Sequence, residues 1–196
     1  MDRLLLATNN PGKIREFQII LGDIPYELVA PSDLGLRLEI EESGNTYREN
    51  AAIKASAYCR AARVLTLADD SGLEVDALGG EPGIRSSRYA GPSAADRERV
   101  AFLLDKMKGV SWEKRTARFR CVIAIAEPDG DVHYFEGKCE GLIDLEPRGE
   151  NGFGYDPIFY FPDYGKTMAE LPESLKNQIS HRARAAQQAV KFLTRA

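Results

Sequence analysis

The chain has 196 residues, of which 43% are hydrophobic and 29% are charged, and its formal net charge is −4. This composition is typical of one globular domain, or of two small lobes, and it excludes collagen-like and low-complexity proteins. The mild acidity argues against duplex nucleic acid as the main ligand, because proteins that bind it usually carry a basic surface.

The first third of the chain alternates predicted strands and helices. Asn10 is a good N-cap residue and Pro11 suits the first helical position, so they mark a helix start. Thr46-Tyr47-Arg48-Glu49 has the pattern of a capping box, and apolar residues follow it at helical spacing. The predicted elements are a strand at 3–8, a helix from Pro11 to a C-cap at Gly22, a strand at 26–30 and a helix at 46–62.

The rest of the chain adds a hairpin to this alternation. The predicted elements are a strand at 64–68 that ends in Asp69-Asp70-Ser71-Gly72, a half-exposed strand at 73–77, a helix around 94–108, paired strands at 116–126 and 132–139, a strand at 158–161 and a helix at about 181–193. Early alternation with a late hairpin predicts an α/β fold whose twisted sheet is mixed and flanked by helices. We expect a single domain, residues 1–196, with two lobes and a cleft between them.

Cysteines and apolar runs indicate the compartment. The three cysteines, Cys59, Cys121 and Cys139, are odd in number and lack CxxC spacing, which argues against disulfides and zinc and fits a reducing cytoplasm. Two histidines favour a hard cation on carboxylates over a transition metal. The longest apolar run, residues 121–126, is far shorter than the roughly 20 residues of a membrane span, and the first seven residues are too short for a signal peptide.

The first candidate site is Thr8-Asn9-Asn10-Pro11-Gly12-Lys13, at a strand-to-helix turn. Backbone N–H groups at a helix start, together with a lysine, form a natural phosphate cradle. The segment is not a P-loop, because Ala7 replaces the first glycine and Ile14 replaces the magnesium-binding Ser or Thr. The alternative is a capped helix start with a solvated lysine.

The second candidate is Asp69-Asp70-Ser71-Gly72, directly after a predicted buried strand. Ligands in open α/β sheets bind beyond the carboxyl ends of strands. Two adjacent carboxylates repel each other, so we expect a bound cation or a shared proton between them. One aspartate could hold Mg²⁺ and activate a water molecule, and Glu39, Glu41 or Glu42 could supply a second ligand. An acidic turn and a solvated charge run are the alternatives.

The third candidate lies near the C-terminus. Glycines flank an aromatic residue in Gly152-Phe153-Gly154-Tyr155-Asp156-Pro157, which would let a flat base approach the backbone and stack on the ring. Lys176, His181 and Arg182 add donors suited to phosphate or to a base oxygen. A tight turn and a helix capped by Ser180 are the alternatives.

Taken in order, these segments resemble the inosine triphosphate pyrophosphatase family. The matching residues include 7–10 with Lys13, 46–51 with Lys54, 68–73, 79–80 with 82–83, 87–89, 152–157 and 180–182. The resemblance implies an elongated two-lobed α/β fold with a central mixed sheet and a deep cleft, and usually a homodimer. It also implies hydrolysis of ITP, dITP and XTP to the monophosphate and pyrophosphate, with Mg²⁺ as cofactor.

The resemblance assigns roles residue by residue. Asp70 is the expected general base and a metal ligand, and Glu41 is the expected second metal ligand. The residues expected to contact substrate are Thr8, Asn9, Asn10, Pro11, Gly12, Lys13, Lys54 and Ser71 at the phosphates and sugar, and Phe153, Gly154, Tyr155, Asp156, Lys176, His181 and Arg182 at the base.

Two alternative functions stay open at this stage. A related pyrophosphatase could prefer pyrimidine nucleotides, because Phe153 would stack on any base. A nucleotide-sensing module would bind without turnover, although the joint presence of Lys13, Lys54 and Asp70 argues against it. We expect no nucleic-acid or membrane partner.

Overall fold

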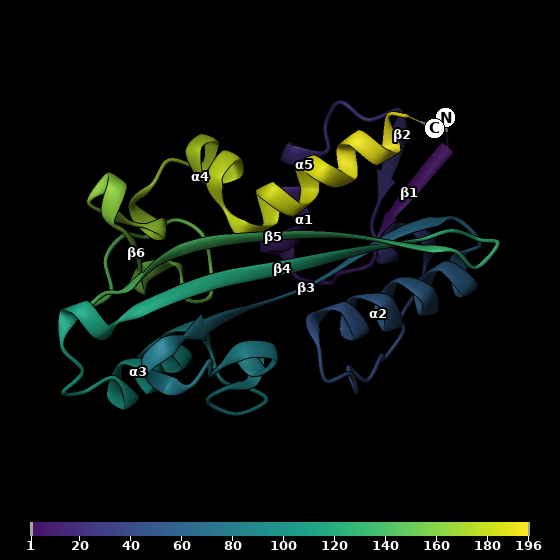
Figure 1. Ribbon diagram of the computed structural model, residues 1–196. Helices are drawn as coiled ribbons and strands as arrows, with labels where there is room; N and C mark the ends of the chain where they lie inside the picture. Colours follow the sequence, from purple (N-terminus) through teal and green to yellow (C-terminus); the bar gives the residue numbers. More distant parts are fainter. Residues whose placement is uncertain (1, 196) are drawn as a thin grey trace. The chain divides into compact units, whose positions relative to one another are not determined.

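The computed structural model describes residues 2–195 (Figure 1). Met1 and Ala196, the ends of the predicted domain, lie outside the described residues. The helices and strands are β1 (Asp2–Leu6), α1 (Pro11–Ile20), β2 (Tyr26–Val29), α2 (Tyr47–Ala62), β3 (Leu65–Val75), α3 (Asp96–Lys106), β4 (Thr116–Ala126), β5 (Val132–Ile143), β6 (Phe159–Phe161), β7 (Lys166–Thr167), α4 (Glu173–Ile179) and α5 (His181–Leu193). Among the described helices, none is long and apolar enough to cross a membrane.

The strands form one sheet in the order β2-β1-β3-β4-β5-β6-β7. β1 pairs in parallel with β2 and β3, whereas β6 pairs antiparallel with β5 and β7. Parallel neighbours need a crossover, which α1 provides between β1 and β2 and α2 provides on the way to β3. The predicted mixed sheet flanked by helices is therefore confirmed.

Two predicted helix caps, at the end of α1 and at the start of α2, need correction. The Asn10 side chain does cap α1, but the helix ends one residue early, with Leu21 rather than Gly22 as its C-cap. At the start of α2 the Thr46 hydroxyl accepts from the Glu49 N–H at 3.1 Å, as a capping box requires. The Glu49 carboxylate, however, accepts from the Asn45 N–H at 2.6 Å instead of returning to Thr46.

The largest correction concerns the acidic segment after the third predicted strand. Asp69 and Asp70 lie inside β3, which continues as one strand of 11 residues rather than breaking into a turn. The apolar residues on both sides of the acidic pair explain this, because Leu67 and Leu73 are both buried in strand positions. Helix α4 was not predicted, since its seven residues are too few to show a helical period.

The chain divides into two compact units. Unit 1 comprises Met1–Asp70, Cys121–Gly137 and His181–Ala196, and unit 2 comprises Ser71–Arg120 and Lys138–Ser180. The long strands β3, β4 and β5 therefore contribute residues to both units.

Unit 1 is built around one face of β1, β3 and β4. Helices α1 and α5 pack on this face, and α2 lies on the other side of the strands (Figure 1). The buried core of this face is Leu4, Leu6, Phe17, Leu21, Ile24, Leu67, Cys121, Ile123, Ile125, Ala185, Ala186, Ala189 and Leu193. The small alanines of α5 let this helix lie close to the strands.

Unit 2 has a core of its own. Helix α3 contributes Val100 and Leu103, and Met107 follows directly after the helix. The remaining buried members are Leu73, Val75, Ala117, Phe119, Cys139, Ile143, Tyr155, Ile158, Phe159, Phe161, Met168 and Leu171.

Gly137 on β5 determines how closely α5 approaches its strand. A Cβ atom at Gly137 would lie 2.2 Å from the His181 carbonyl oxygen and 2.5 Å from the Ala185 nitrogen, closer than atoms can come. The first turn of α5, which carries His181 and Arg182, therefore rests directly on the strand backbone. Only glycine permits this contact.

We predict that Gly137→Ala destabilises the protein by about 1–3 kcal/mol, the usual cost of overpacking a tight contact. Gly22→Ala is the matched control, because a Cβ there would meet its nearest atoms at 3.4 and 3.5 Å, and its free energy of unfolding should change by less than about 0.5 kcal/mol. Urea unfolding followed by circular dichroism measures both variants. Equal stability of the two variants would contradict the close packing of α5 on Gly137.

Candidate functional site

The turn between β1 and α1 directs Lys13 toward β3. The Asn10 side-chain oxygen accepts from the N–H groups of Gly12 and Lys13 at 2.9 and 3.2 Å, and the Thr8 hydroxyl accepts from the Asn10 N–H at 3.2 Å. These bonds confirm the capped helix start. The lysine is not solvated, because its side chain is only 15% exposed and reaches Asp69. Asn9, Asn10 and Pro11 stay exposed beside it.

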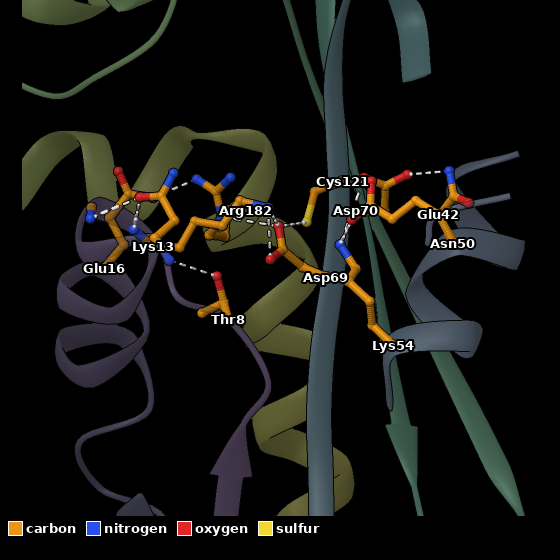
Figure 2. Close-up of polar contacts among 12 residues, drawn as sticks. Thr8, Lys13, Glu16, Glu42, Asn50, Lys54, Asp69, Asp70, Cys121 and Arg182 are labelled. Atoms are coloured by element: carbon orange, nitrogen blue, oxygen red, sulfur yellow. Dashed lines mark hydrogen bonds and ion pairs between the residues drawn. The ribbon is translucent and has the colours of Figure 1, made fainter. Parts of the chain in front are cut away.

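Asp69 and Asp70 point to opposite faces of β3, as neighbouring residues of a strand must (Figure 2). Asp69 faces α1 and α5, and Asp70 faces α2 (Figure 2). β1 ends at Leu6, level with Leu67, so both aspartates lie beyond the carboxyl end of β1. The two aspartates were expected to follow the end of their own strand. They lie instead within β3 and beyond the end of its neighbour, β1.

Asp69 belongs to a buried ionic network, which we call the Asp69 cluster: Lys13, Glu16, Asp69 and Arg182. Lys13 Nζ lies 2.9 Å from both carboxylate oxygens of Asp69. Arg182 Nε lies 3.4 Å from Asp69 Oδ2, and its Nη1 lies 2.5 Å from Glu16 Oε2. Burial alone would raise the pKa of Asp69, but Lys13 and Arg182 together hold it well below its usual range. Asp69 therefore stays ionised at neutral pH, where it anchors the two cations.

Asp70 has different neighbours, which we call the Asp70 cluster: Asp70, Asn50, Lys54 and Glu42. Asn50, itself fully buried, donates its side-chain N–H to Asp70 Oδ2 at 3.1 Å. Lys54 Nζ lies 2.7 Å from Glu42 Oε1 and 3.9 Å from Asp70 Oδ1. Burial raises the pKa of Asp70, and the charge of Glu42 raises it further despite the opposing effect of Lys54.

Lys54 remains a cation in this cluster. Burial would lower its pKa, but the charges of Asp69, Asp70 and Glu42 raise it above its ordinary value. Glu42 is thus a carboxylate that opposes ionisation of Asp70. The expected cation or shared proton between the two adjacent aspartates stays a prediction.

The loop before α2 places Glu42, rather than Glu41, beside Lys54. Glu41 is exposed, and its assignment as a metal ligand stays a prediction. Among residues 2–195, no group of three or more Asp, Glu, His or Cys side chains is arranged to hold a metal ion. Asp70 and Glu42 supply two carboxylates on one side of β3, a donor set that suits Mg²⁺, which usually keeps several water ligands.

Two members of these clusters, Glu16 and Asn50, were not assigned to the site from the sequence, and neither was Cys121, which contacts Asp69. Glu16 is three residues from Lys13 on the same helix, so helical spacing could have indicated it. Asn50 likewise lies one turn before Lys54 on α2. The Cys121 Sγ lies 3.8 Å from Asp69 Oδ2, and the cysteine is buried as predicted.

The third candidate forms a separate cluster in unit 2. Lys176 Nζ lies 2.5 Å from Asp156 Oδ2 and 5.0 Å from the centre of the Phe153 ring, and Lys176 and Asp156 are each 4% exposed. The Phe153 N–H donates to the same oxygen of Asp156 at 3.0 Å. Gly152 has φ +78°, and a Cβ there would lie 2.0 Å from Asp156 Oδ2, so this position requires glycine.

The remaining predicted residues divide between the two units. His181 is buried at the start of α5, and Arg182 joins the Asp69 cluster rather than Lys176. Tyr155 is buried and its hydroxyl donates to the Ser86 carbonyl at 2.9 Å. Ser71 follows Asp70 on β3 and is half-buried. Their contacts with substrate stay predictions.

Residues 4–192 of this chain match a model of the Ham1 family. The chain therefore belongs to that family. It is 51% identical to a dITP/XTP pyrophosphatase of Desulforamulus reducens over 98% of this chain and 96% of the relative. It is 48% identical to the dITP/XTP pyrophosphatase of Bacillus subtilis over 98% of each chain. The resemblance found in the sequence is thereby confirmed.

Solved structures of Ham1 proteins have the same fold as this chain. A HAM1 protein from Coxiella burnetii superposes with a TM-score of 0.91 at 42% identity and covers 100% of both chains. The Ham1 protein of Staphylococcus aureus superposes with a TM-score of 0.87 at 44% identity and covers 98% of both chains.

We predict opposite effects on stability from isosteric changes at the two adjacent aspartates. Asp69→Asn leaves buried cations without their counter-charge and should cost about 3–5 kcal/mol in the free energy of unfolding. Asp70→Asn removes a buried charge whose pKa is raised, so its stability near pH 7 should equal or exceed that of the wild type. Chemical unfolding of both variants without added metal gives the comparison.

The pH dependence of the first variant provides a further check. A depressed pKa in the folded state means that the contribution of Asp69 is present above its unfolded pKa. The stability difference between wild type and Asp69→Asn should therefore persist down to about pH 4, the unfolded pKa of an aspartate, and shrink only in stronger acid. A difference that vanished near pH 6 would contradict the ion pairs of Asp69.

Proposed function

We propose that this chain hydrolyses non-standard purine nucleoside triphosphates, namely ITP, dITP and XTP, to the monophosphate and pyrophosphate. The observation that carries the proposal is the Asp70 cluster in a member of the Ham1 family. The relatives named dITP/XTP pyrophosphatase, which are 51% and 48% identical over 98% of this chain, support the same reaction here. The chain is accordingly a nucleoside triphosphate pyrophosphatase.

Mg²⁺ is the proposed cofactor, held on the α2 side of β3. Asp70 and Glu42 are the ligands that the geometry favours, and Glu41 is the ligand that the family resemblance favours. The raised pKa of Asp70 supports this assignment, because a bound cation would relieve the buried charge. When bound, Mg²⁺ neutralises phosphate charge and makes a coordinated water more acidic.

Asp70 is the proposed general base. Its ionised carboxylate takes a proton from the water that attacks the α-phosphorus, and the bond from that phosphorus to its bridging oxygen breaks to release pyrophosphate. The Asn50 side chain holds Oδ2 and so fixes the plane of the carboxylate. This arrangement meets the geometric demand on a base, which must be held within hydrogen-bond reach of the reacting proton.

Lysines provide the proposed electrostatic contacts to the triphosphate. Lys54 stands beside Asp70, and Lys13 is held near the α1 start by Asp69. Thr8 and Asn10 lie in the same turn and are proposed to donate to phosphate oxygens, together with backbone N–H groups of that turn. Charges fixed before the reaction need no reorganisation during it.

The unit 2 cluster is proposed to bind the base. Phe153 would stack on the purine, while Lys176 would donate to a base oxygen with Asp156 as its counter-charge. Hypoxanthine and xanthine present an oxygen acceptor at position 6, whereas adenine presents an amino donor. A buried donor left unpaired against adenine discriminates strongly against ATP.

We also propose a homodimer in the cytoplasm. Both proposals come from the family resemblance, and the three buried free cysteines accord with a reducing compartment. Light scattering coupled to gel filtration measures the subunit number, and a monomer at micromolar concentration would contradict the dimer.

We predict that pyrophosphate is released with Mg²⁺ from ITP, dITP and XTP, and that ATP and dTTP are poor substrates. A panel of nucleotides with a coupled pyrophosphate assay measures this, with EDTA as the metal-free control. Turnover confined to pyrimidine nucleotides would overturn the base assignment. Binding without turnover of any nucleotide would favour the sensing module.

Asp70→Asn should lower kcat for ITP by about 10²–10⁴-fold, the usual contribution of a general base. Nucleotide binding should stay largely intact. Asp76→Asn is the control, since Asp76 is an exposed partner of Arg118 in unit 2 and should keep wild-type kcat. Rapid-quench turnover and equilibrium binding separate the two effects. Near-normal kcat in Asp70→Asn would remove Asp70 from its role as the base.

A further inference from the structure

A carboxylate outside the proposed chemistry holds the glycine loop, residues 152–156, which carries Phe153. Asp96 Oδ2 accepts a hydrogen bond from the Gly154 N–H at 2.7 Å, although the two residues are 58 positions apart in the chain. Asp96 is the first residue of α3. The bond therefore joins the start of a helix to the middle of the loop.

Asp96 is itself held in place by Arg99, one turn further along α3. The guanidinium of Arg99 pairs with Asp96 Oδ1, the oxygen that does not contact Gly154. Its other terminal nitrogen donates to the carbonyls of Ser87 and Ala94 at 2.9 and 2.6 Å. The Arg99 side chain is 17% exposed and the Asp96 side chain is 44% exposed, so Arg99 is the more shielded partner of this charge-assisted pair.

Tyr155 fastens the next residue of the loop to the same part of unit 2. Its hydroxyl donates to the Ser86 carbonyl at 2.9 Å, and the Ser86 hydroxyl in turn accepts from the Leu73 N–H at 2.9 Å. Tyr155 and Ser86 are 3% and 8% exposed. Two consecutive loop residues are thus tied to one supporting segment, residues 83–99.

The loop needs such support because of its glycines. Gly152 and Gly154 have φ values of +78° and +63°. Glycine adopts these conformations readily, but it adopts many others as well, so the glycines alone do not hold the loop in one conformation. On one side of the loop Asp156 holds the Phe153 N–H, and on the other side Asp96 holds the Gly154 N–H. The Cα atom that carries the Phe153 ring therefore lies between two hydrogen-bonded amides.

We propose that Asp96 is a positioning residue for base recognition, which sets the Phe153 ring before the nucleotide binds. The proposal rests on the function proposed above. It adds that part of the affinity for the base comes from ordering of the glycine loop in the free protein, since a pre-ordered loop loses less entropy on binding.

The test compares Asp96→Ala with Asp105→Ala. Asp105 pairs with Lys108 at the same helical spacing, but these side chains are 65% and 79% exposed, and the ion pair joins two residues outside the loop. Loss of one charge-assisted bond predicts a rise in KM for ITP of about 5–30-fold for Asp96→Ala, with kcat close to wild type. Asp105→Ala should leave both constants unchanged.

A competitive inhibitor that lacks a base distinguishes a specific loss of base binding from general disruption of the substrate site. Inorganic tripolyphosphate probes only the phosphate contacts, so its inhibition constant should be the same in wild type and Asp96→Ala. Asp96→Asn keeps an acceptor for the Gly154 N–H and should recover most of the affinity for ITP. An equal loss of tripolyphosphate affinity, or no recovery in Asp96→Asn, would overturn the proposal.

The Gly154 amide gives a readout that does not depend on folding of the alanine variant. In the wild type its hydrogen exchange should be at least about tenfold slower than in an unstructured chain, because the amide is hydrogen-bonded. Exchange at the unprotected rate would overturn the proposal. A wild type that does not hydrolyse ITP would refute the proposed function instead, whereas ITP turnover with an unchanged KM in Asp96→Ala refutes the positioning role alone.

Discussion

The alternation of side chains along β3 is the constraint on which the site depends. Because neighbouring residues of a strand face opposite ways, Asp69 and Asp70 meet different partners although they share one peptide bond. Asp69 meets Lys13 and Arg182 and stays ionised, while Asp70 meets Glu42 and Asn50 and carries a raised pKa. Under the proposed function one strand therefore supplies both an anchor and the general base, and a register shift of one residue would exchange the faces of the two aspartates.

The buried network around Asp69 fixes geometry more than it adds stability. Taking Glu16, Asp69 and Arg182 out of water costs several kcal/mol per ion, and their mutual attraction roughly offsets this cost. In return the network connects α1, β3 and α5 through charged bonds of defined direction. β1 ends at Leu6, level with Leu67, and so does not extend alongside Asp69. Lys13 can therefore reach Asp69 past the end of β1.

Periodic and capped segments could be predicted from the sequence, and irregular ones could not. Asn10 fixed the start of α1, and helix α5 has its predicted bounds, since both signals are local. The sequence could not show that β3 continues through its acidic pair, because packing on both sides overrides the turn-like composition. Nor could it distinguish Glu42 from Glu41, whose directions depend on an irregular loop, or pair Arg182 with Glu16 across 166 residues.

The charge balance of the two clusters connects this architecture to the reaction. Lys13, Lys54 and Arg182 stand against four carboxylates, Glu16, Glu42, Asp69 and Asp70, so the two clusters together carry one excess negative charge. Under the proposed function the carboxylates beside Lys13 and Lys54 oppose their attraction for a triphosphate, to a degree that depends on the distance of each charge from the phosphates. A bound divalent cation would reverse the sign of this sum, so in the proposed reaction one ion would both favour binding of the substrate and activate the water. In the proposed reaction the lysines and the metal would then share the attraction of the phosphate oxygens.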